Sequence, residues 1–416
     1  MDRLISTRNE SARCVLFALL FALLLFLPTC QRDSTEHILR EQASSHRFSL
    51  VAWHVKNLPS KLVSSPVNLQ AMPPLQERKA ILGSFFELQK EMERLEREMA
   101  PGTALYGSTS EMETLKSRSD EISLKYDPLA QRVESIIEQD IRQVLTSEGI
   151  DFRFMGWNFI FPPVLFIFQD APNLLVVSPR DHIDRLADLL LSPHMTISEF
   201  EMIENRLSCY DNLSAIVLKL GGMASYPAIV DYDSGFYRSI FLAAHEWTHQ
   251  YLFFHPLGRA YFNEGISREM NEAVADMVGY ELADRIYRQY GYKPPPHHPL
   301  PSDTGFNFTA EMSQTRLVTD CLLKDGKIDE AEQYMAERQR LFVQEGYYIR
   351  KLNQSYFAFH GTYAFDPASV SPVDEQMEEL RDHFVTLGEF VLAVRDLRTH
   401  EQLLALLDEK NSGQLD

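Results

Sequence analysis

The middle of the chain carries two histidines four residues apart, with a glutamate beside the first, in the stretch "AAHEWTHQYLFFH". On a helix, His245 and His249 lie about 40° apart around the axis and about 6 Å apart along it, so both imidazoles can reach one ion. Glu246 projects beside the pair, where it can deprotonate a water held by a zinc ion. The spacing therefore predicts a catalytic zinc site, against the alternative of two buried histidines on an amphipathic helix.

A catalytic zinc needs a third protein ligand and an open fourth position. His255 stands ten residues after His245. Because a continuous helix carries it about 15 Å along the axis, His255 cannot share the ion. The position where a glycine would let the chain turn back is Leu252. We expect His255 to lie instead at the helix end before Pro256, where the helix dipole favours an imidazolium.

The downstream stretch "REMNEAVADMVGYEL" offers another third ligand. Glu272 and Asp276 face one way on a predicted helix whose other residues are apolar, and a buried carboxylate pair requires a cation or a donor. The two motifs together, H-E-x-x-H and N-E-x-x-x-D, resemble the gluzincin metallopeptidases, which include thermolysin and the membrane-alanyl-type aminopeptidases. The resemblance implies that Glu272 is the third zinc ligand and that Asp276 accepts the other ring N–H of a zinc-binding histidine.

The distance between the two motifs differs from that of the family. Glu272 follows His249 by 23 residues, whereas about 19 or 20 is usual in the relatives. Glu269 fits the shorter offset and stays an alternative ligand. Glu272 is preferred because its neighbours match the motif and because the intervening loop tolerates changes in length. The resemblance covers about 35 to 50 residues and identifies no particular member.

Two further segments could handle a peptide substrate. In "GGMASYPAIV", Pro227 favours an edge strand, to which a peptide could add. Gly222 and Met223 resemble part of the G-x-M-E-N strand of the aminopeptidases, but Ala224 replaces their amine-binding glutamate, which argues against a requirement for a free N-terminus. An ordinary edge strand with a glycine bulge is the alternative.

The second segment is "NQSYFAFHGTYAF", in which His360 or Tyr363 could donate to the oxyanion of the reaction, unless these aromatics only fill the core. His297 and His298 belong to the loop "PPPHHP", which we expect to be a surface connection.

The remaining pattern predicts the elements that position these residues. An apolar stripe predicts a helix from 75 to Pro101, and Asp127-Pro128 predicts the start of another that ends near Gly149. "FIFPPVLFIF" and "NLLVVSP" are expected to form a strand pair, followed by a helix over Ile183–Leu191. The chain is expected to be helical from 236 to its end, with a helical corner at Asp325-Gly326.

These elements predict an α+β fold that is predominantly helical, with a small mixed sheet whose edge strand precedes the zinc-binding helix pair, and with helical N-terminal and C-terminal parts. We divide the chain into a leader (1–30), a linker (31–74), a helical region (75–150), the metallopeptidase catalytic core (151–291) and a helical C-terminal part (292–416).

Charge and the N-terminus limit the partners. The formal net charge of −19 repels phosphate backbones, so no nucleic acid is expected as a partner. The apolar run over residues 14–30 is intermediate between a signal peptide and a membrane span. A cleaved signal, a retained anchor and a lipoprotein lipidated at Cys30 therefore all stay open. Each carries the catalytic part out of the cytoplasm, membrane-attached or secreted. Pairing of Cys209 with Cys321 also stays open.

The sequence therefore predicts a membrane-attached or exported metallopeptidase that holds one Zn²⁺ and hydrolyses peptide bonds in a peptide or protein, with Glu246 as general base. Two alternatives remain. One is a membrane-tethered helical binding protein with a structural or inactive zinc site. The other is a zinc hydrolase that acts on a non-peptide amide.

Overall fold

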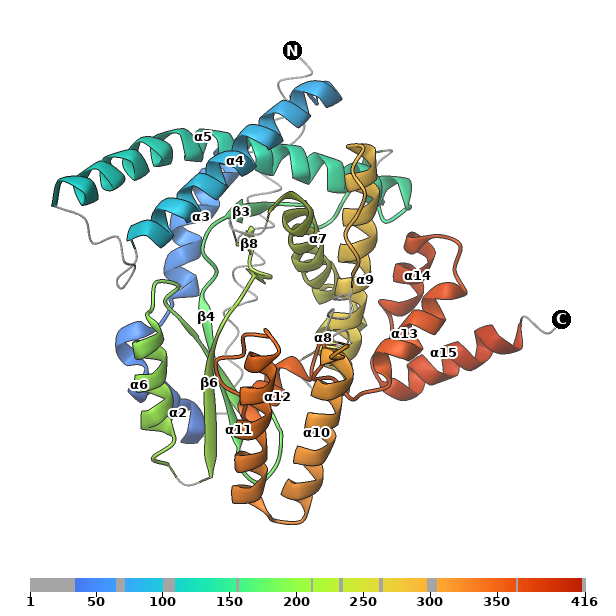
Figure 1. Cartoon of the computed structure of the whole chain (residues 1–416). Helices are drawn as coiled ribbons and strands as arrows, with labels where there is room; N and C mark the ends of the chain where they lie inside the picture. Colours follow the sequence, from blue (N-terminus) through green and yellow to red (C-terminus); the bar gives the residue numbers. More distant parts are fainter. Residues whose placement is uncertain are drawn as a thin grey trace.

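The computed structural model describes residues 34–64, 72–99, 109–154, 157–210, 212–231, 235–261, 265–297, 305–363 and 366–413. Most of these residues are helical and the strands form small sheets, so the predicted predominantly helical α+β class is confirmed (Figure 1). The predicted leader lies outside the described residues. Within the described ranges, no helix is both long and apolar enough to cross a membrane.

The elements fall into three groups along the chain. The N-terminal helices are α2 (Ser34–Gln42), α3 (Leu50–Ser64), α4 (Leu75–Met99) and α5 (Thr109–Ser147). The middle of the chain contains β1 (Phe152–Phe154), β2 (Trp157–Phe159), β3 (Phe166–Phe168), β4 (Asn173–Pro179), β5 (Ala187–Leu191), α6 (Ile197–Leu207), β6 (Leu213–Lys219), β7 (Gly222–Met223), β8 (Ala228–Val230), α7 (Gly235–Phe253), α8 (Pro256–Ala260) and α9 (Gly265–Gln289). The C-terminal helices are α10 (Phe308–Lys324), α11 (Ile328–Gln344), α12 (Gln354–His360), α13 (Val373–Asp382), α14 (Leu387–Val394) and α15 (His400–Ser412).

The N-terminal helices follow the prediction for α4 but not for α5. Helix α5 begins at Thr109 and runs through Pro128, so the predicted start at Asp127-Pro128 is wrong. Ile122 and Tyr126 are buried on the N-terminal side of this proline. Their packing against α4 outweighs the local cost of proline in a helix. Helix α5 ends before Gly149, whose positive φ of 73° fits the predicted stop.

The strands form two three-stranded sheets and the β1–β2 hairpin. The first sheet has the order β5-β4-β6 and is antiparallel. The second has the order β3-β8-β7, with β3 parallel and β7 antiparallel to β8. The expected pairing of β3 with β4 is therefore wrong, and so is the helix expected over 183–191, because Ala187–Leu191 is strand β5. A short run of leucines suits either element, and the neighbouring strand β4 decides it.

Proline 227 was expected to mark an edge strand. Instead it directly precedes β8, the central strand of its sheet, and lies outside the ladder, so no sheet hydrogen bond is lost there. The edge of the sheet is formed by β7, with Gly222 and Met223.

Side chains close the outer edge of β3. The N–H groups of Phe166 and Phe168 donate to Glu138 (3.0 Å) and Glu134 (2.9 Å) of α5. Lys61 lies between the two carboxylates, at 2.8 and 2.7 Å, and balances their buried charge. The edge of β3 is therefore not available to another strand.

The outer edge of β6 is closed in the same way. The N–H of Val217 donates to the buried Glu204 of α6 (2.8 Å). The carbonyl of Val217 accepts from Arg350 (3.0 Å). Asn353, which caps α12, donates to the carbonyl of Ala215 (2.9 Å). On the far side of this sheet, β5 is bridged by the segment around Arg47. Of the described edges of the two three-stranded sheets, β7 is the one for which no covering side chain or bridge is found.

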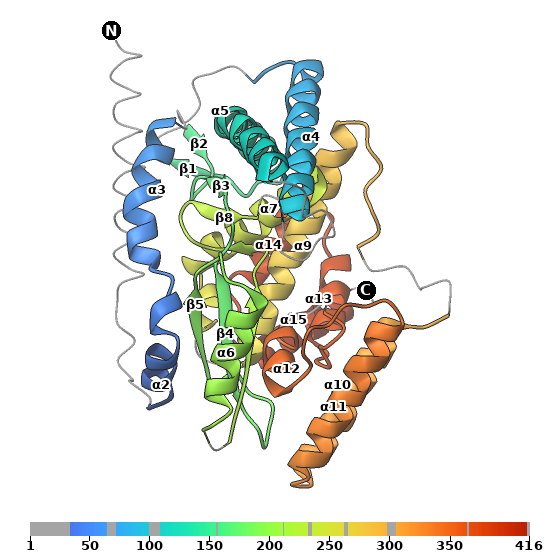
Figure 2. The same ribbon diagram turned by 60° about the vertical axis from the view of Figure 1, so that its left-hand side comes forward.

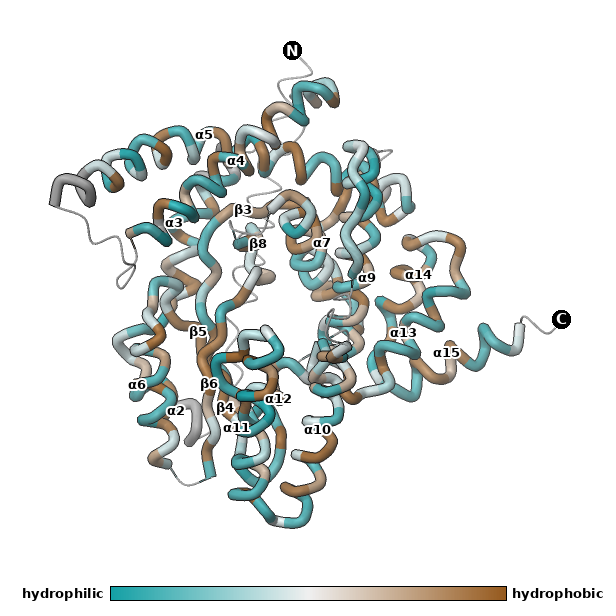
Figure 3. Tube along the Cα trace, in the orientation of Figure 1, coloured by the Kyte–Doolittle hydropathy of each residue, from teal (hydrophilic) through white to brown (hydrophobic). Residues whose placement is uncertain are grey.

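The main core joins α4, α5, α7, α9 and α13 to α15. Hydrophobic residues are concentrated on β4 to β6 and along parts of α7 (Figure 3). Helices α10 and α11 form a projecting hairpin with its own small core (Figure 2). Its corner at Asp325-Gly326 is as predicted, with a φ of 75° at Gly326. Cys209 and Cys321 are exposed free thiols.

Two glycine substitutions test how the C-terminal helices pack. A Cβ at Gly388 would overlap the backbone oxygen of Glu148, where α14 contacts the end of α5, whereas a Cβ at Gly83 in α4 would meet nothing within 4 Å. We expect Gly388→Ala to lower the free energy of unfolding by about 1–3 kcal/mol. Gly83→Ala, the control, should raise it by about 0.5–1 kcal/mol. Denaturant titration measures both, and a Gly388→Ala protein as stable as wild type would contradict this contact.

Candidate metal centre

Helices α7 and α9 pack along each other and carry the predicted ligands (Figure 1). Gly279 of α9 allows their close approach, because a Cβ there would lie 3.0 Å from the ring of Phe241. On its other side α7 packs under β8, and Trp247 donates to the carbonyl of Pro162 (2.8 Å). Both faces of α7 are therefore fixed, which holds the histidines in one position.

The structure brings together the three side chains predicted as metal ligands. The two Nε2 atoms of His245 and His249 are 3.0 Å apart, and Oε2 of Glu272 lies 3.6 and 3.3 Å from them. Ligands about 2.0–2.1 Å from one tetrahedral zinc are about 3.3 Å from each other. The three separations therefore match those around a single zinc ion.

The opposite ring nitrogens fix the tautomers of both histidines. The Nδ1–H of His249 donates to Oδ1 of Asn271 (2.6 Å), and Nδ1 of His245 lies 2.9 Å from Oδ1 of Asp276. An acceptor on the Nδ1 side keeps the proton there, so that Nε2 presents its lone pair to the centre. The predicted acceptor Asp276 lies at ion-pair distance from His245, although Nδ1 of His245 forms no hydrogen bond with it.

The centre consists of three acceptors without a donor. Glu272 is 3 % exposed, its Oε1 accepts from the hydroxyl of Tyr261 (3.2 Å), and its Oε2 has no hydrogen-bond partner. Burial opposes a charge on His249, but Glu272 outweighs this and raises the pKa of His249 to about 9. A buried site that attracts a proton this strongly fits a bound cation, and two imidazoles with a carboxylate suit Zn²⁺.

Among the described residues, no fourth histidine, cysteine, aspartate or glutamate joins this cluster. Three protein ligands leave one position for water or substrate, which is the pattern of a catalytic zinc site. A structural site would have four.

Glu246 lies beside the cluster, against strand β7. A Cβ at Gly222 would be 2.5 Å from Oε1 of Glu246, so the absent side chain leaves the space that this carboxylate occupies. Glu246 is 7 % exposed. Burial raises its pKa, while His245 and His249 act in the opposite direction. A buried carboxylate next to a metal position is suited to accept a proton.

Of the two predicted oxyanion donors, Tyr363 is the one that interacts electrostatically with residues of the centre. Burial raises its pKa well above the usual value, and the carboxylates of Glu272 and Glu246 raise it further. Its hydroxyl therefore stays protonated. The ring of His360 stacks on Tyr356 (4.1 Å) and its Nδ1 pairs with Asp366 (2.8 Å). These contacts orient the ring of His360 toward Asp366, and none of them involves the metal ligands.

The alternative ligand Glu269 and two further histidines considered in the sequence, His255 and His297, lie outside the cluster. His255 caps α8 as the helix boundary predicted, but burial and Arg395 lower its pKa, so the expected imidazolium is wrong. Glu269, the alternative ligand, faces α13 and hydrogen-bonds Ser371. His297 is half-exposed and stacks on Tyr280 (4.4 Å). His298 lies outside the described residues.

The structure adds residues that no sequence pattern pointed to. Tyr261 follows α8 in an irregular loop and reaches Glu272 only through the fold. Asn271 was read as part of a motif, without the role of fixing His249.

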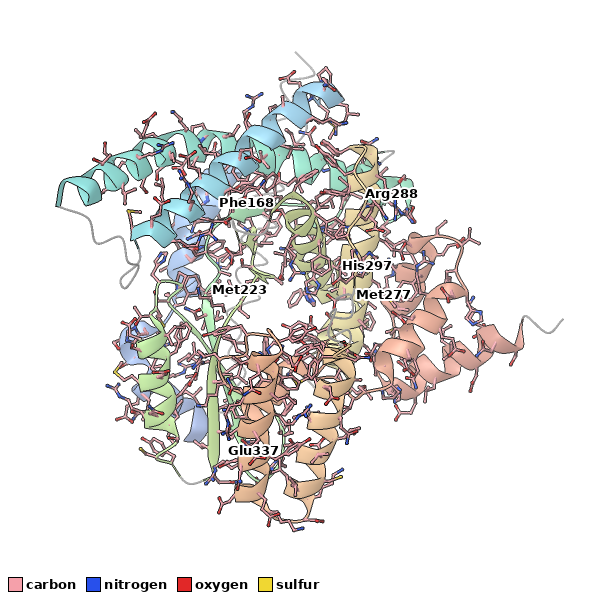
Figure 4. The ribbon with its side chains drawn as sticks, in the orientation of Figure 1. Phe168, Met223, Met277, Arg288, His297 and Glu337 are labelled. Atoms are coloured by element: carbon pink, nitrogen blue, oxygen red, sulfur yellow. The ribbon has the colours of Figure 1, made fainter. Side chains whose placement is uncertain are left out.

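Side chains from α7, α9 and α12 fill this central region, between Met223 on one side and Met277 and His297 on the other (Figure 4).

Comparison with protein-family models, with curated proteins and with solved structures finds no match for this chain.

Metal analysis tests the three ligands. We expect wild-type protein to bind about one equivalent of zinc and His249→Ala to lose it, because two ligands do not hold the ion. Asp276→Asn should keep the site but weaken zinc affinity about 10- to 100-fold. His255→Ala, a change on the same chain segment outside the cluster, serves as the control and should bind zinc as wild type does. Unchanged zinc content in His249→Ala would contradict the site.

Proposed function

We propose that this protein is a zinc-dependent metallopeptidase, membrane-attached or exported through its N-terminal leader. One observation carries the proposal: three buried acceptors of His245, His249 and Glu272 converge at the separations of tetrahedral zinc ligands. Glu246 lies beside them, and no fourth ligand from the described residues closes the site. The resemblance to gluzincin sequences supports the same proposal.

The chemistry divides between the ion and the side chains. When bound, a zinc ion would polarise the scissile carbonyl and make a water molecule more acidic. Glu246 would accept a proton from the attacking water and deliver it to the leaving amine. Tyr363, held in its protonated form by the surrounding carboxylates, would donate to the developing oxyanion.

The uncovered edge of β7 would bind the substrate backbone. Asp231 N–H donates to the carbonyl of Gly221 (2.9 Å), so Gly221 faces β8. In an antiparallel ladder, hydrogen-bonded and non-hydrogen-bonded residue pairs alternate, so the N–H and C=O of the next residue, Gly222, point away from β8. A peptide that adds to β7 would hydrogen-bond there, directly beside Glu246. Backbone recognition of this kind accepts many sequences, and Ala224 supplies no carboxylate to bind a free amine.

The alternative of a helical binding protein with a structural zinc lacks support from the site. A structural zinc would need a fourth protein ligand, and the described residues bring three together. It would also have no use for a buried carboxylate beside the ion.

Substitution of the general base separates binding from catalysis. Glu246→Gln removes the proton acceptor but leaves all three ligands in place. We expect unchanged zinc content and a loss of peptide hydrolysis of about 10²- to 10⁴-fold, the range for general acid–base catalysis. Retained turnover of a peptide library, measured with and without a chelator, would exclude Glu246 as the base.

Two neighbouring glycines test the contact between β7 and the base. A Cβ at Gly222 would collide with the carboxylate of Glu246, whereas a Cβ at Gly221 would be in ordinary contact, 3.7 Å from Leu242. We expect Gly222→Ala to retain zinc and to lose about 10²-fold in kcat/KM, because the base is displaced. Gly221→Ala should differ from wild type by less than about threefold. Equal activity of the two variants would contradict the contact.

A further inference from the structure

A second group of side chains borders the metal centre on the side of α12. Arg185 lies in the loop just before β5, and its guanidinium is 5.5 Å from the centre of the ring of Phe359. The ring of Phe359 is in turn 5.1 Å from that of Tyr363. Arg185 is thus placed next to the residue proposed as the oxyanion donor.

The same group is coupled electrostatically to the metal ligands. Burial raises the pKa values of Tyr261 and Tyr363, the carboxylate of Glu272 raises both further, and Arg185 lowers both. Glu272 and Arg185 therefore act on the same two hydroxyls. Of the two, Tyr261 contacts Glu272 directly, and Tyr363 packs on the ring that Arg185 covers.

The guanidinium of Arg185 has donors to spare. Its Nε and Nη2 both contact Oδ2 of Asp188, at 2.9 and 2.8 Å. A guanidinium carries five N–H donors, so Nη1 and part of Nη2 remain, and no other acceptor from the described residues meets them. The Arg185 side chain is only 14 % exposed, whereas Asp188 is 43 % exposed. Among the described residues, the acid partner of this largely buried cation is Asp188, which is half in water, and such a cation favours an additional anion.

Resting on the proposed peptidase function, we propose that Arg185 selects substrates that carry a carboxylate near the scissile bond. Carboxylates match the planar fork of an arginine, which can bind them through two parallel hydrogen bonds. The carboxylate could belong to an acidic side chain or to the C-terminus of the peptide, and the chemistry of recognition is the same. In a chain with a net charge of −19, a cation at this place would also offset the general repulsion of acidic peptides.

Matched peptides test the selection. A library digest first gives a cleaved sequence, which is then made with Glu or Gln next to the scissile bond and with a free or an amidated C-terminus. We expect zinc-loaded wild type to cleave the favoured acid about 10- to 100-fold better in kcat/KM than its amide. The Glu–Gln pair reports an acidic side chain, and the acid–amide pair reports the C-terminus.

Variants of Arg185 should remove this preference. In Arg185→Gln, the ratio of kcat/KM for the acid to kcat/KM for the amide should fall to about 1, whatever the change in the overall rate. Arg185→Lys, which keeps the charge but not the fork, should retain part of the preference. Asp188→Asn separates recognition from structure: it should keep or increase the preference, whereas a merely structural ion pair would make it behave like Arg185→Gln. Arg132→Gln, at an exposed pair on α5, controls for net charge and should leave the preference unchanged.

Binding separates this inference from the peptidase proposal. The affinity of zinc-loaded Glu246→Gln for the same peptides is measured by calorimetry, which needs no turnover. If the library digest gives no cleaved sequence, peptides that bind this variant are selected from the same library and made as the same acid and amide pairs. Tighter binding of the acid than of the amide, lost with Arg185→Gln in that background, supports the inference even if the wild type hydrolyses none of them. Equal binding and equal kcat/KM for acid and amide, or a preference that survives Arg185→Gln, would overturn it.

Discussion

The structure around the candidate site depends on three hydrogen-bond acceptors that meet without a donor. The Nε2 atoms of His245 and His249 and Oε2 of Glu272 lie 3.0 to 3.6 Å from one another in a buried place. The lone pairs of these three acceptor atoms repel one another unless a cation lies between them. The protein holds it by fixing the other end of each side chain, through Asn271, Asp276 and Tyr261. The packing of α7 on α9 therefore brings together three side chains that could hold a positive ion.

Side chains also determine which sheet edges near the site can accept another strand. Buried carboxylates occupy the edge of β3, and side chains from α6 and the start of α12 occupy the edge of β6. These contacts remove two sites at which a foreign strand could add. The short strand β7 is left, and its Gly222 lies against Glu246. The backbone N–H and C=O of Gly222 that point away from β8 therefore lie next to Glu246, the proposed general base.

The sequence was sufficient for what depends on local spacing and insufficient for what depends on contacts across the fold. Two histidines one turn apart are aligned by the helix itself, and Glu272 and Asp276 likewise share one helix face, so all four could be predicted. The contact of Gly222 with Glu246 and the reach of Tyr261 to Glu272 join segments distant in sequence and leave no periodic pattern. The same limit explains two wrong predictions. Residues 187–191 were predicted to be helical, but their leucines form strand β5 because they pair with β4. Helix α5 was predicted to start at Pro128, but it begins earlier because its N-terminal part packs on α4.

A crystal structure of the zinc-loaded protein would locate the ion. We expect one zinc ion bound to Nε2 of His245, Nε2 of His249 and Oε2 of Glu272, at about 2.0–2.2 Å, with a water molecule as the fourth ligand. A fourth protein side chain on the ion, or zinc bound elsewhere with these three residues free, would contradict it.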